Sequence, residues 1–325
     1  MSNMKKVLVL GPMHEEGMKL LRAREDVTFE VLHDVSEESI LKHIDGVNGL
    51  AVRVAQISRK IVEAAPGLQV VSRHGVGYDS VDVDACSDHG VAVAIAPRSN
   101  APSVAEQAMM FLLAIAKQMP ALDKLTRSGN WKERETVKPI DIEGRTLLVI
   151  GLGRIGSRVV KRALGFGMRV LGHDPYLSTE AIAATGAEPV ADFRAVLGEV
   201  DAITVHTPRN EETIGMIGAS ELAGLREGAI VLNCARGGIV DEPALLAAVQ
   251  SGHIRGAGLD VFDVEPAPAD HIFMKEPRII FTPHTAGISL EASMRSSYQT
   301  MENILACFDG TIDPEVVVNR KALGK

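Results

Sequence analysis

Three residues that could transfer a proton and bind an anion follow short apolar runs in the C-terminal half of the 325-residue chain. Arg236 follows VLNCA, Glu265 follows GLDVFDV and His284 follows IIFTP. If these runs are strands of an open α/β sheet, the three side chains lie beyond its carboxyl edge, where ligands bind in such sheets. A guanidinium, a carboxylate and an imidazole there would supply an anion clamp, a charge partner and a proton donor. Each residue alone is more often structural, so only the combination indicates catalysis.

A glycine-rich turn precedes them in VIGLGRIGSRV, residues 149–159, with glycines at positions 151, 153 and 156. The next apolar run ends at Asp174, close to the spacing of about 20 residues expected of a ribose-binding acid. The glycines would let the backbone approach a pyrophosphate at a helix N-terminus, with Arg154 as a cationic contact. Asp174 would accept hydrogen bonds from a ribose and repel a 2′-phosphate, which favours NAD over NADP. The alternatives are a methyltransferase-like nucleotide site and a purely structural turn.

The elements that must position these residues follow from an alternation of short apolar runs with amphipathic segments. The alternation extends from residue 5 to about 96 and resumes from 145 to about 290. It predicts an α/β protein with two doubly wound parallel sheets, each flanked by helices. Between the two halves, the apolar segment 103–118 should form a buried helix. The polar stretch 124–144, which holds the only tryptophan, is either a surface loop or an arm that packs on another subunit.

Composition and charge argue against several classes of function. The net charge of −8 argues against nucleic acid as the main partner, because phosphate binding requires a basic face. No stretch approaches the roughly 18 apolar residues of a membrane span, and the start of the chain is typical of a strand and turn rather than a signal peptide. The three widely spaced cysteines indicate free thiols in a reducing cytoplasm, and no metal site is expected.

Beyond single residues, the chain contains GLGRIG, HTP at 206–208, NCARGGIVDE, LDVF with Glu265-Pro266, and Pro283-His284. Together these motifs resemble the D-isomer-specific 2-hydroxyacid dehydrogenases, most closely the 3-phosphoglycerate dehydrogenase branch, and the resemblance covers nearly the whole chain. It implies a flavodoxin-like substrate domain, residues 1–99 and 291–325, into which a Rossmann NAD-binding domain, residues 100–290, is inserted. Residues from about 100 to 143 would form the dimerisation arm of a homodimer.

The resemblance also implies a role for each matching residue. His284 would protonate the carbonyl oxygen of a 2-oxo acid while NADH delivers hydride to C2. Glu265 would pair with the imidazole and favour its charged form, and Arg236 would hold the substrate carboxylate and polarise the carbonyl. Asp260 would face the nicotinamide carboxamide, and Cys234 would line the cofactor path rather than act as a nucleophile. The residues implied to bind NAD are Gly151, Gly153, Arg154, Ile155, Gly156, Asp174, Thr207, Pro208, Cys234, Ala235, Asp260 and Gly287.

A second set of residues, in the first domain, would bind the substrate, a small anionic 2-hydroxy or 2-oxo acid. In SRHGVGYDSVD, two closely spaced glycines could expose backbone N–H groups to a carboxylate, and the resemblance places this contact at Val76 and Gly77. Arg53 and Arg73 end neighbouring predicted strands, and in the phosphoglycerate branch arginines at the matching places bind the substrate phosphate. A plain turn and surface salt bridges are the alternatives.

The leading substrate is therefore 3-phosphoglycerate. Two features depart from that branch: the segment PHTAGISLEA lacks the Leu-Gly pair that more often follows the histidine, and the chain stops at Lys325 without the regulatory domains that many members carry. Serine feedback through such a domain is thus not expected. Reduction of hydroxypyruvate or glyoxylate is the alternative activity, and an NAD-sensing co-repressor is the alternative from a different class.

Overall fold

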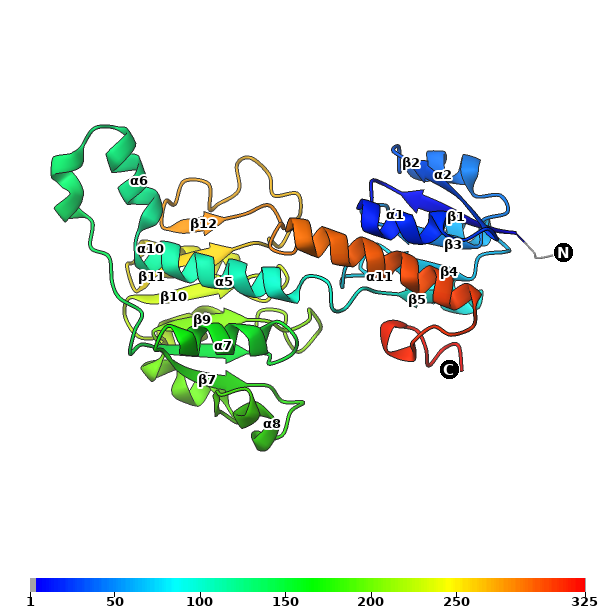
Figure 1. Cartoon of the computed structure of the whole chain (residues 1–325). Coiled ribbons are helices and arrows are strands. Elements are labelled where there is room, and N and C mark those ends of the chain that lie inside the picture. The colour runs from blue at the N-terminus through cyan, green and yellow to red at the C-terminus, as the bar shows by residue number, and fades with distance from the viewer. Residues whose placement is uncertain (1–3, 325) are drawn as a thin grey trace. The chain divides into compact units, whose positions relative to one another are not determined.

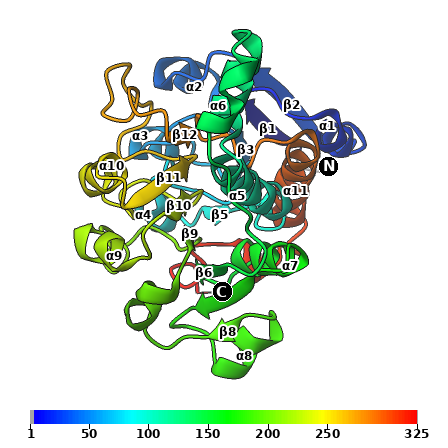
Figure 2. The same ribbon diagram turned by 90° about the vertical axis from the view of Figure 1, so that its left-hand side faces the viewer.

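The structure is a computed structural model that describes residues 4–324, and the chain divides into two compact units. The first unit comprises Met1–Asn100 and Gly287–Lys325, and the second comprises Ala101–Ala286. Each unit contains one parallel β-sheet with helices on both faces (Figure 1, Figure 2). The predicted fold class, two doubly wound parallel sheets, is therefore confirmed.

The sheet of the first unit has the strand order β2-β1-β3-β4-β5. Its strands are β1 (Lys5–Leu10), β2 (Val27–Leu32), β3 (Gly49–Val52), β4 (Val70–Arg73) and β5 (Ala92–Ala94). Its helices are α1 (Glu15–Arg22), α2 (Glu37–His43), α3 (Arg59–Glu63), α4 (Val83–Asp88), α11 (Leu290–Phe308) and the 3-10 helix η3 (Pro314–Val316). Alternate residues of β1 enter different cores, with Val7 and Val9 in one and Leu8 and Leu10 in the other. This strand order is that of flavodoxin-like folds.

The sheet of the second unit has the strand order β12-β11-β10-β9-β6-β7-β8, and its neighbouring strands are all parallel. Its strands are β6 (Thr146–Ile150), β7 (Arg169–His173), β8 (Glu188–Pro189), β9 (Ala202–Val205), β10 (Ala229–Asn233), β11 (Ile254–Leu259) and β12 (Ile279–Phe281). The chain order reverses where β6 and β9 lie side by side. In open α/β sheets the carboxyl ends of strands at such a reversal form the ligand site.

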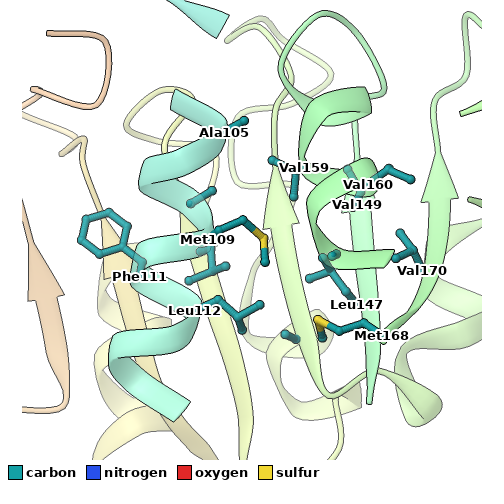
Figure 3. Packing of buried hydrophobic residues seen from close by; sticks show 14 of the residues in the cluster. Ala105, Met109, Phe111, Leu112, Leu147, Val149, Val159, Val160, Met168 and Val170 are labelled. Carbon is teal, nitrogen blue, oxygen red and sulfur yellow. The ribbon is translucent and has the colours of Figure 1, made fainter. Parts of the chain in front are cut away.

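Helices cover both faces of this second sheet (Figure 2). All the helices of this unit are α5 (Ala101–Ala116), α6 (Met119–Arg127), η1 (Trp131–Thr136), α7 (Gly156–Gly165), α8 (Thr179–Ala184), η2 (Phe193–Glu199), α9 (Ala219–Gly224) and α10 (Glu242–Gln250), and α6 and η1 do not belong to the covering layers. Residues of α5 and α7 share one core with Leu147 and Val149 of β6 (Figure 3). Leu148 and Ile150 of the same strand enter the other core, with α9 and α10.

The helix predicted from the apolar segment 103–118 is present as α5 and is buried along most of its length. Phe111 lies on β11 so closely that a Cβ atom at Gly258 would be 2.5 Å from the Cβ atom of Phe111. Gln118, which follows α5, has a left-handed backbone with φ of 50°. The chain turns there into α6, which stands clear of the second unit's sheet (Figure 1).

The segment after α5 makes little contact with its own unit. Within this described part of the chain, no side chain of α6 or η1 is buried, and Trp131 is 63% exposed.

Across residues 4–324, the structure holds no helix with the length and apolar character needed to cross a bilayer.

Two histidines at strand ends are kept neutral by their surroundings. Burial, together with the charge of Arg53, lowers the pKa of His74 to about 4. Burial alone lowers the pKa of His206 to about 4. The Nε2 atom of His206 lies 2.9 Å from Thr204 Oγ1, and its buried Nδ1 atom has no hydrogen-bond partner among residues 4–324. Neutral imidazoles are therefore part of the packed state of both units.

Phe111→Ala should lower the free energy of unfolding of the second unit by about 3 to 5 kcal/mol, because it empties the space of a buried ring between α5 and β11. Urea denaturation followed by circular dichroism measures this change. Leu164→Ala is the control, because Leu164 is 41% exposed on α7, and it should cost less than about 1 kcal/mol. Equal losses in the two variants would contradict the packing described for α5.

Acidification should destabilise the fold through His206. Its folded-state pKa of about 4 lies below the ordinary 6.5, so between these values the unfolded chain binds more protons than the folded chain. The contribution of neutral His206 to the free energy of unfolding is fully present above pH 6.5. It decreases by up to about 3 kcal/mol as the pH falls towards 4.

Urea midpoints between about pH 7.5 and about pH 4.5 measure this loss against His206→Gln, which does not titrate there. The other acid-sensitive groups act equally in both proteins. The wild-type midpoint should fall more steeply, and parallel slopes would show that His206 is not held neutral.

Candidate functional site

The glycine-rich turn between β6 and α7 has three glycines with three different surroundings. Gly151 has φ of +86°, and a Cβ atom there would lie 2.7 Å from the carbonyl oxygen of His206. A Cβ atom at Gly156 would lie 1.9 Å from the carbonyl oxygen of Gly151. Gly153 is different, because a Cβ atom there would have no protein atom within 4 Å. Packing therefore requires glycine at the first and third positions, while the open space at the second is what close approach of a pyrophosphate requires.

The start of α7 offers hydrogen-bond donors to a ligand. Ile155 is its N-cap residue, and no side chain caps the helix. The first N–H groups of a helix lack partners within it, and together with the helix dipole they attract phosphate. Arg154 lies exposed just before this helix. These features fit the predicted pyrophosphate site.

Asp174 follows β7 and turns back towards the glycine-rich turn. Its Oδ2 atom accepts a hydrogen bond from the backbone N–H of Leu152 at 2.9 Å, and its Oδ1 atom accepts one from Tyr176 N–H at 3.0 Å. Each carboxylate oxygen has a second lone pair, so two hydroxyl groups could still be bound. The carboxylate thus lies beside the turn, where an adenosine ribose would follow the pyrophosphate.

The neighbouring strand ends supply further cofactor candidates. Thr207 Oγ1 is buried and lacks a hydrogen-bond partner among the described residues, as expected where a ligand provides one. Pro208 is held by its carbonyl oxygen, which accepts from Thr213 Oγ1 at 2.7 Å. Burial raises the pKa of the Cys234 thiol, and the charge of Asp260 raises it further. Cys234, which precedes Ala235 after β10, is therefore a buried thiol, unsuited to act as a nucleophile.

His284 occupies a strained turn after β12. Its φ is 51°, a left-handed value that is unusual for a residue with a Cβ atom. Its N–H lies 2.8 Å from the carbonyl oxygen of Asp260 and 3.0 Å from that of Thr282. Thr285 and Ala286 continue the turn, and the backbone N–H group of each needs a hydrogen-bond acceptor.

Asp260 provides those partners from the end of β11. Its Oδ1 atom accepts from Thr282 Oγ1 at 2.5 Å and from Thr285 N–H at 2.8 Å, while Oδ2 accepts from Ala286 N–H at 2.9 Å. Burial raises the pKa of this carboxyl group, and the three hydrogen bonds oppose the rise. Sequence reasoning assigned Asp260 only to the nicotinamide. The structure adds that it fixes the backbone around His284.

Glu265 and His284 are brought together. The Nδ1 atom of His284 lies 2.7 Å from Glu265 Oε2, and the two side chains are 49% and 35% exposed. The other carboxylate oxygen, Oε1, accepts a hydrogen bond from Phe262 N–H at 3.0 Å. Within the described residues, no protein group bonds to Nε2 of His284. That nitrogen is therefore the one available to a ligand.

Arg236 lies at the end of β10, the strand next to β11. Asn233 shapes its turn, with Oδ1 accepting from Ala235 N–H at 2.9 Å and Nδ2 donating to the Arg236 carbonyl oxygen at 2.8 Å. One guanidinium nitrogen, NH1, donates to the carbonyl oxygen of Ala235 at 2.8 Å. Arg236, Glu265 and His284 thus follow three adjacent strands, β10, β11 and β12. The role of Asn233 was not foreseen from the sequence.

The predicted substrate residues lie at the carboxyl ends of β3 and β4 in the first unit. Arg53 NH1 donates to the carbonyl oxygen of Pro12 at 3.1 Å. Arg73 is more fully engaged, because Nε donates to the carbonyl oxygen of Gly77 at 2.8 Å and NH1 to that of Arg53 at 2.7 Å. Arg73 therefore ties the loop that contains Val76 to the end of β3.

His74 belongs to the same loop and contacts the C-terminal helix. Its Nε2 atom lies 3.1 Å from Ser297 Oγ on α11, and that hydroxyl accepts from His14 N–H at 2.8 Å. Gly287, predicted to bind cofactor, lies at the start of the returning segment, where a Cβ atom would be 2.8 Å from the side-chain nitrogen of Asn100. The contacts of Asn100 and Ser297 were missed, because nothing in their spacing indicates them.

Known proteins are similar to this chain over nearly its whole length. A D-3-phosphoglycerate dehydrogenase of Methanocaldococcus jannaschii is 38% identical over 327 residues, which cover 99% of this chain and 62% of that protein. The chain spans less than two thirds of the length of this relative and of the next curated relatives. The solved structure of the TT0316 protein from Thermus thermophilus matches with a TM-score of 0.86 and 33% identity, covering 96% of this chain and 99% of that one.

A second solved structure, an NAD-dependent formate dehydrogenase from Staphylococcus aureus in complex with NAD, has a TM-score of 0.82 and 27% identity, with coverage of 96% and 98%. The family described as D-isomer specific 2-hydroxyacid dehydrogenase, NAD binding domain, matches residues 109–286. This range lies within the second unit, whose glycine turn and strand ends were described above. The chain therefore belongs to the D-isomer specific 2-hydroxyacid dehydrogenase family.

Proposed function

We propose that the protein is an NAD-dependent D-2-hydroxyacid dehydrogenase, which transfers hydride reversibly between NAD(H) and C2 of a small 2-hydroxy or 2-oxo acid. The observation that carries the proposal is the 2.7 Å contact between Glu265 and His284, which leaves Nε2 of the imidazole available. This contact lies in the second unit, which contains the match to the NAD-binding domain of the family. A carboxylate-oriented imidazole is a general acid and base suited to this reaction.

The chain's own residues would handle the proton and the substrate's charge. NADH, when bound, would supply the hydride for C2 of the 2-oxo acid. His284 donates the proton on Nε2 to the carbonyl oxygen, so that the hydroxyl group forms and the imidazole becomes neutral. Glu265 orients the imidazole through Nδ1, and Arg236 holds the substrate carboxylate. In the oxidative direction His284 takes the proton back.

The residues proposed to hold NAD form one path along the strand ends. The pyrophosphate would lie against Gly153 and the start of α7, with Arg154 nearby, and the ribose hydroxyls against Asp174. Thr207 Oγ1 would bond to the cofactor, which explains its lack of a partner among the described residues. Asp174 would repel a 2′-phosphate, so NAD should be used in preference to NADP.

The first unit is proposed as the substrate domain, and 3-phosphoglycerate as the leading substrate. Arg53 would bind the phosphate, while Val76 and Gly77 would offer backbone N–H groups to the carboxylate. Arg73 would join this phosphate contact, and its guanidinium also donates to the carbonyl oxygens of Gly77 and Arg53. These hydrogen bonds already occupy part of the Arg73 guanidinium. They therefore favour a second candidate function, the reduction of hydroxypyruvate or glyoxylate, because neither substrate carries a phosphate.

We also propose that α6 and η1 form the arm of a homodimer. The support is that their described side chains are all at least partly exposed, including the apolar Met119 and Trp131. Partner subunits normally cover such apolar groups when they project from a fold. A cytoplasmic location is proposed on the ground that Cys86 and Cys234 are buried free thiols.

His284→Ala should abolish turnover while leaving NADH affinity unchanged. Loss of a general acid of this kind costs about 10²- to 10⁴-fold in kcat. The measurement is NADH oxidation with a panel of 2-oxo acids, alongside the Kd for NADH from its fluorescence. His253→Gln serves as control, because His253 contacts the carbonyl oxygen of Leu222 and no residue assigned to the site.

Activity that persists in His284→Ala would remove the proton donor from this scheme. A wild-type protein that binds NADH but turns over no acid on the panel would instead support an NAD-sensing binding protein.

Arg53→Ala should raise KM for 3-phosphohydroxypyruvate by about 10- to 100-fold and change KM for hydroxypyruvate little, because only the first substrate carries the phosphate. Steady-state kinetics with both acids measure the difference. Arg59→Ala, an exposed change on α3 of the same unit, is the control. Equal effects on the two substrates would exclude phosphate recognition by Arg53.

A further inference from the structure

The turn that carries Glu265 has little apolar material to hold it in place. Residues 263–266 are exposed, and the first buried side chain before them is that of Phe262. Glu265 itself contacts Phe262 N–H and the imidazole of His284. An exposed turn of this kind is mobile unless polar contacts fix it. The geometry between Glu265 and His284 therefore depends on whatever anchors the turn.

Glu242 is the principal anchor. It is the first residue of α10, and its side chain is 12% exposed. Its Oε1 atom accepts a hydrogen bond from Asp263 N–H at 3.0 Å, and Oε2 lies 3.0 Å from Nε2 of His271. Both oxygens are thus bonded to the segment that follows β11. The helix dipole favours a carboxylate at this position.

His271 is fixed in one tautomer and one orientation. Its Nδ1 atom accepts from Phe273 N–H at 3.4 Å, so the ring proton lies on Nε2 and is donated to Glu242. The ring packs edge-on against Phe262 with centroids 5.2 Å apart and against Phe273 at 5.0 Å. The His271 side chain is only 9% exposed. A buried imidazole with both nitrogens bonded gives Glu242 a rigid partner.

The same turn is joined to the turn that follows Arg236. A Cβ atom at Gly237 would lie 1.8 Å from the carbonyl oxygen of Phe262, so the two backbones are in direct contact. The N–H of Gly238 donates to Asp263 Oδ1 at 2.5 Å. Movement of one turn would therefore move the other.

We propose that Glu242, Asp263 and His271 are positioning residues that hold the Glu265 turn against His284 and against the Arg236 turn. The inference rests on the proposed function, because it assigns the three residues to the support of that chemistry. None of them needs to touch substrate or cofactor. The competing explanation is that Glu242 only stabilises the start of α10, and the two explanations differ in what they predict for turnover.

Glu242→Gln tests the inference, because glutamine keeps the shape but presents its amide group where His271 requires an acceptor. It should lower kcat by about 3- to 10-fold with KM for NADH unchanged.

Glu221→Gln is the matched control. Glu221 also lies in the first turn of a helix, α9, and its side chain is 11% exposed and bonded to Gly218 N–H and Arg194. It should lower the melting temperature as Glu242→Gln does and leave kcat at the wild-type value. Equal kinetics in the two variants, or a wild-type kcat in Glu242→Gln, would overturn the inference.

Asp263 provides a second route if Glu242→Gln does not fold, because its side chain is exposed. Asp263→Ala removes the acceptor of Gly238 N–H and should show the same loss of kcat with KM for NADH unchanged. Asp263→Asn keeps an oxygen that can accept this bond and should recover most of the loss. Absence of an effect in Asp263→Ala, or no recovery in Asp263→Asn, would count against the inference. Failure of the proposed function is separate, since the wild-type protein would then reduce no 2-oxo acid.

Discussion

The hydrogen bond between Glu265 Oε2 and His284 Nδ1, 2.7 Å long, is the contact on which the proposed chemistry depends. It occupies one nitrogen of the imidazole and leaves Nε2 to exchange a proton with a bound acid. The contact also fixes the orientation of the imidazole ring. The pair is possible because β11 and β12 are parallel neighbours, so the two residues follow adjacent strand ends.

The surrounding structure is organised around that contact. His284 has a left-handed backbone, which costs on the order of 1 to 2 kcal/mol for a residue with a Cβ atom. Asp260 opposes this cost with three hydrogen bonds to the turn on either side of His284. On the other side of the pair, Glu242 and Asp263 hold the turn that carries Glu265. His284 and Glu265 are thus held by separate groups of residues at the carboxyl edge of the same sheet.

The sheets and the glycine turn could be predicted because they depend on local patterns, namely the period of apolar residues and the spacing of glycines. The strand-end positions of the catalytic candidates followed from the same patterns and from family motifs. Contacts between distant segments could not be predicted: Glu242 and His271 are 29 residues apart, and the three acceptor contacts of Asp260 span two strand ends. Arg73 shows the same limit, because nothing in the sequence indicated that its guanidinium donates to the Gly77 carbonyl oxygen.

The role proposed for His284, proton exchange through Nε2 while Glu265 holds Nδ1, is tested most directly by a crystal structure. The protein would be crystallised with NADH and oxamate, an unreactive analogue of a 2-oxo acid. We expect the C2 oxygen of oxamate within about 3 Å of His284 Nε2, the oxamate carboxylate at Arg236, and Glu265 still bonded to Nδ1. Oxamate bound with its C2 oxygen away from His284, or an imidazole turned from Glu265 in the complex, would contradict this role.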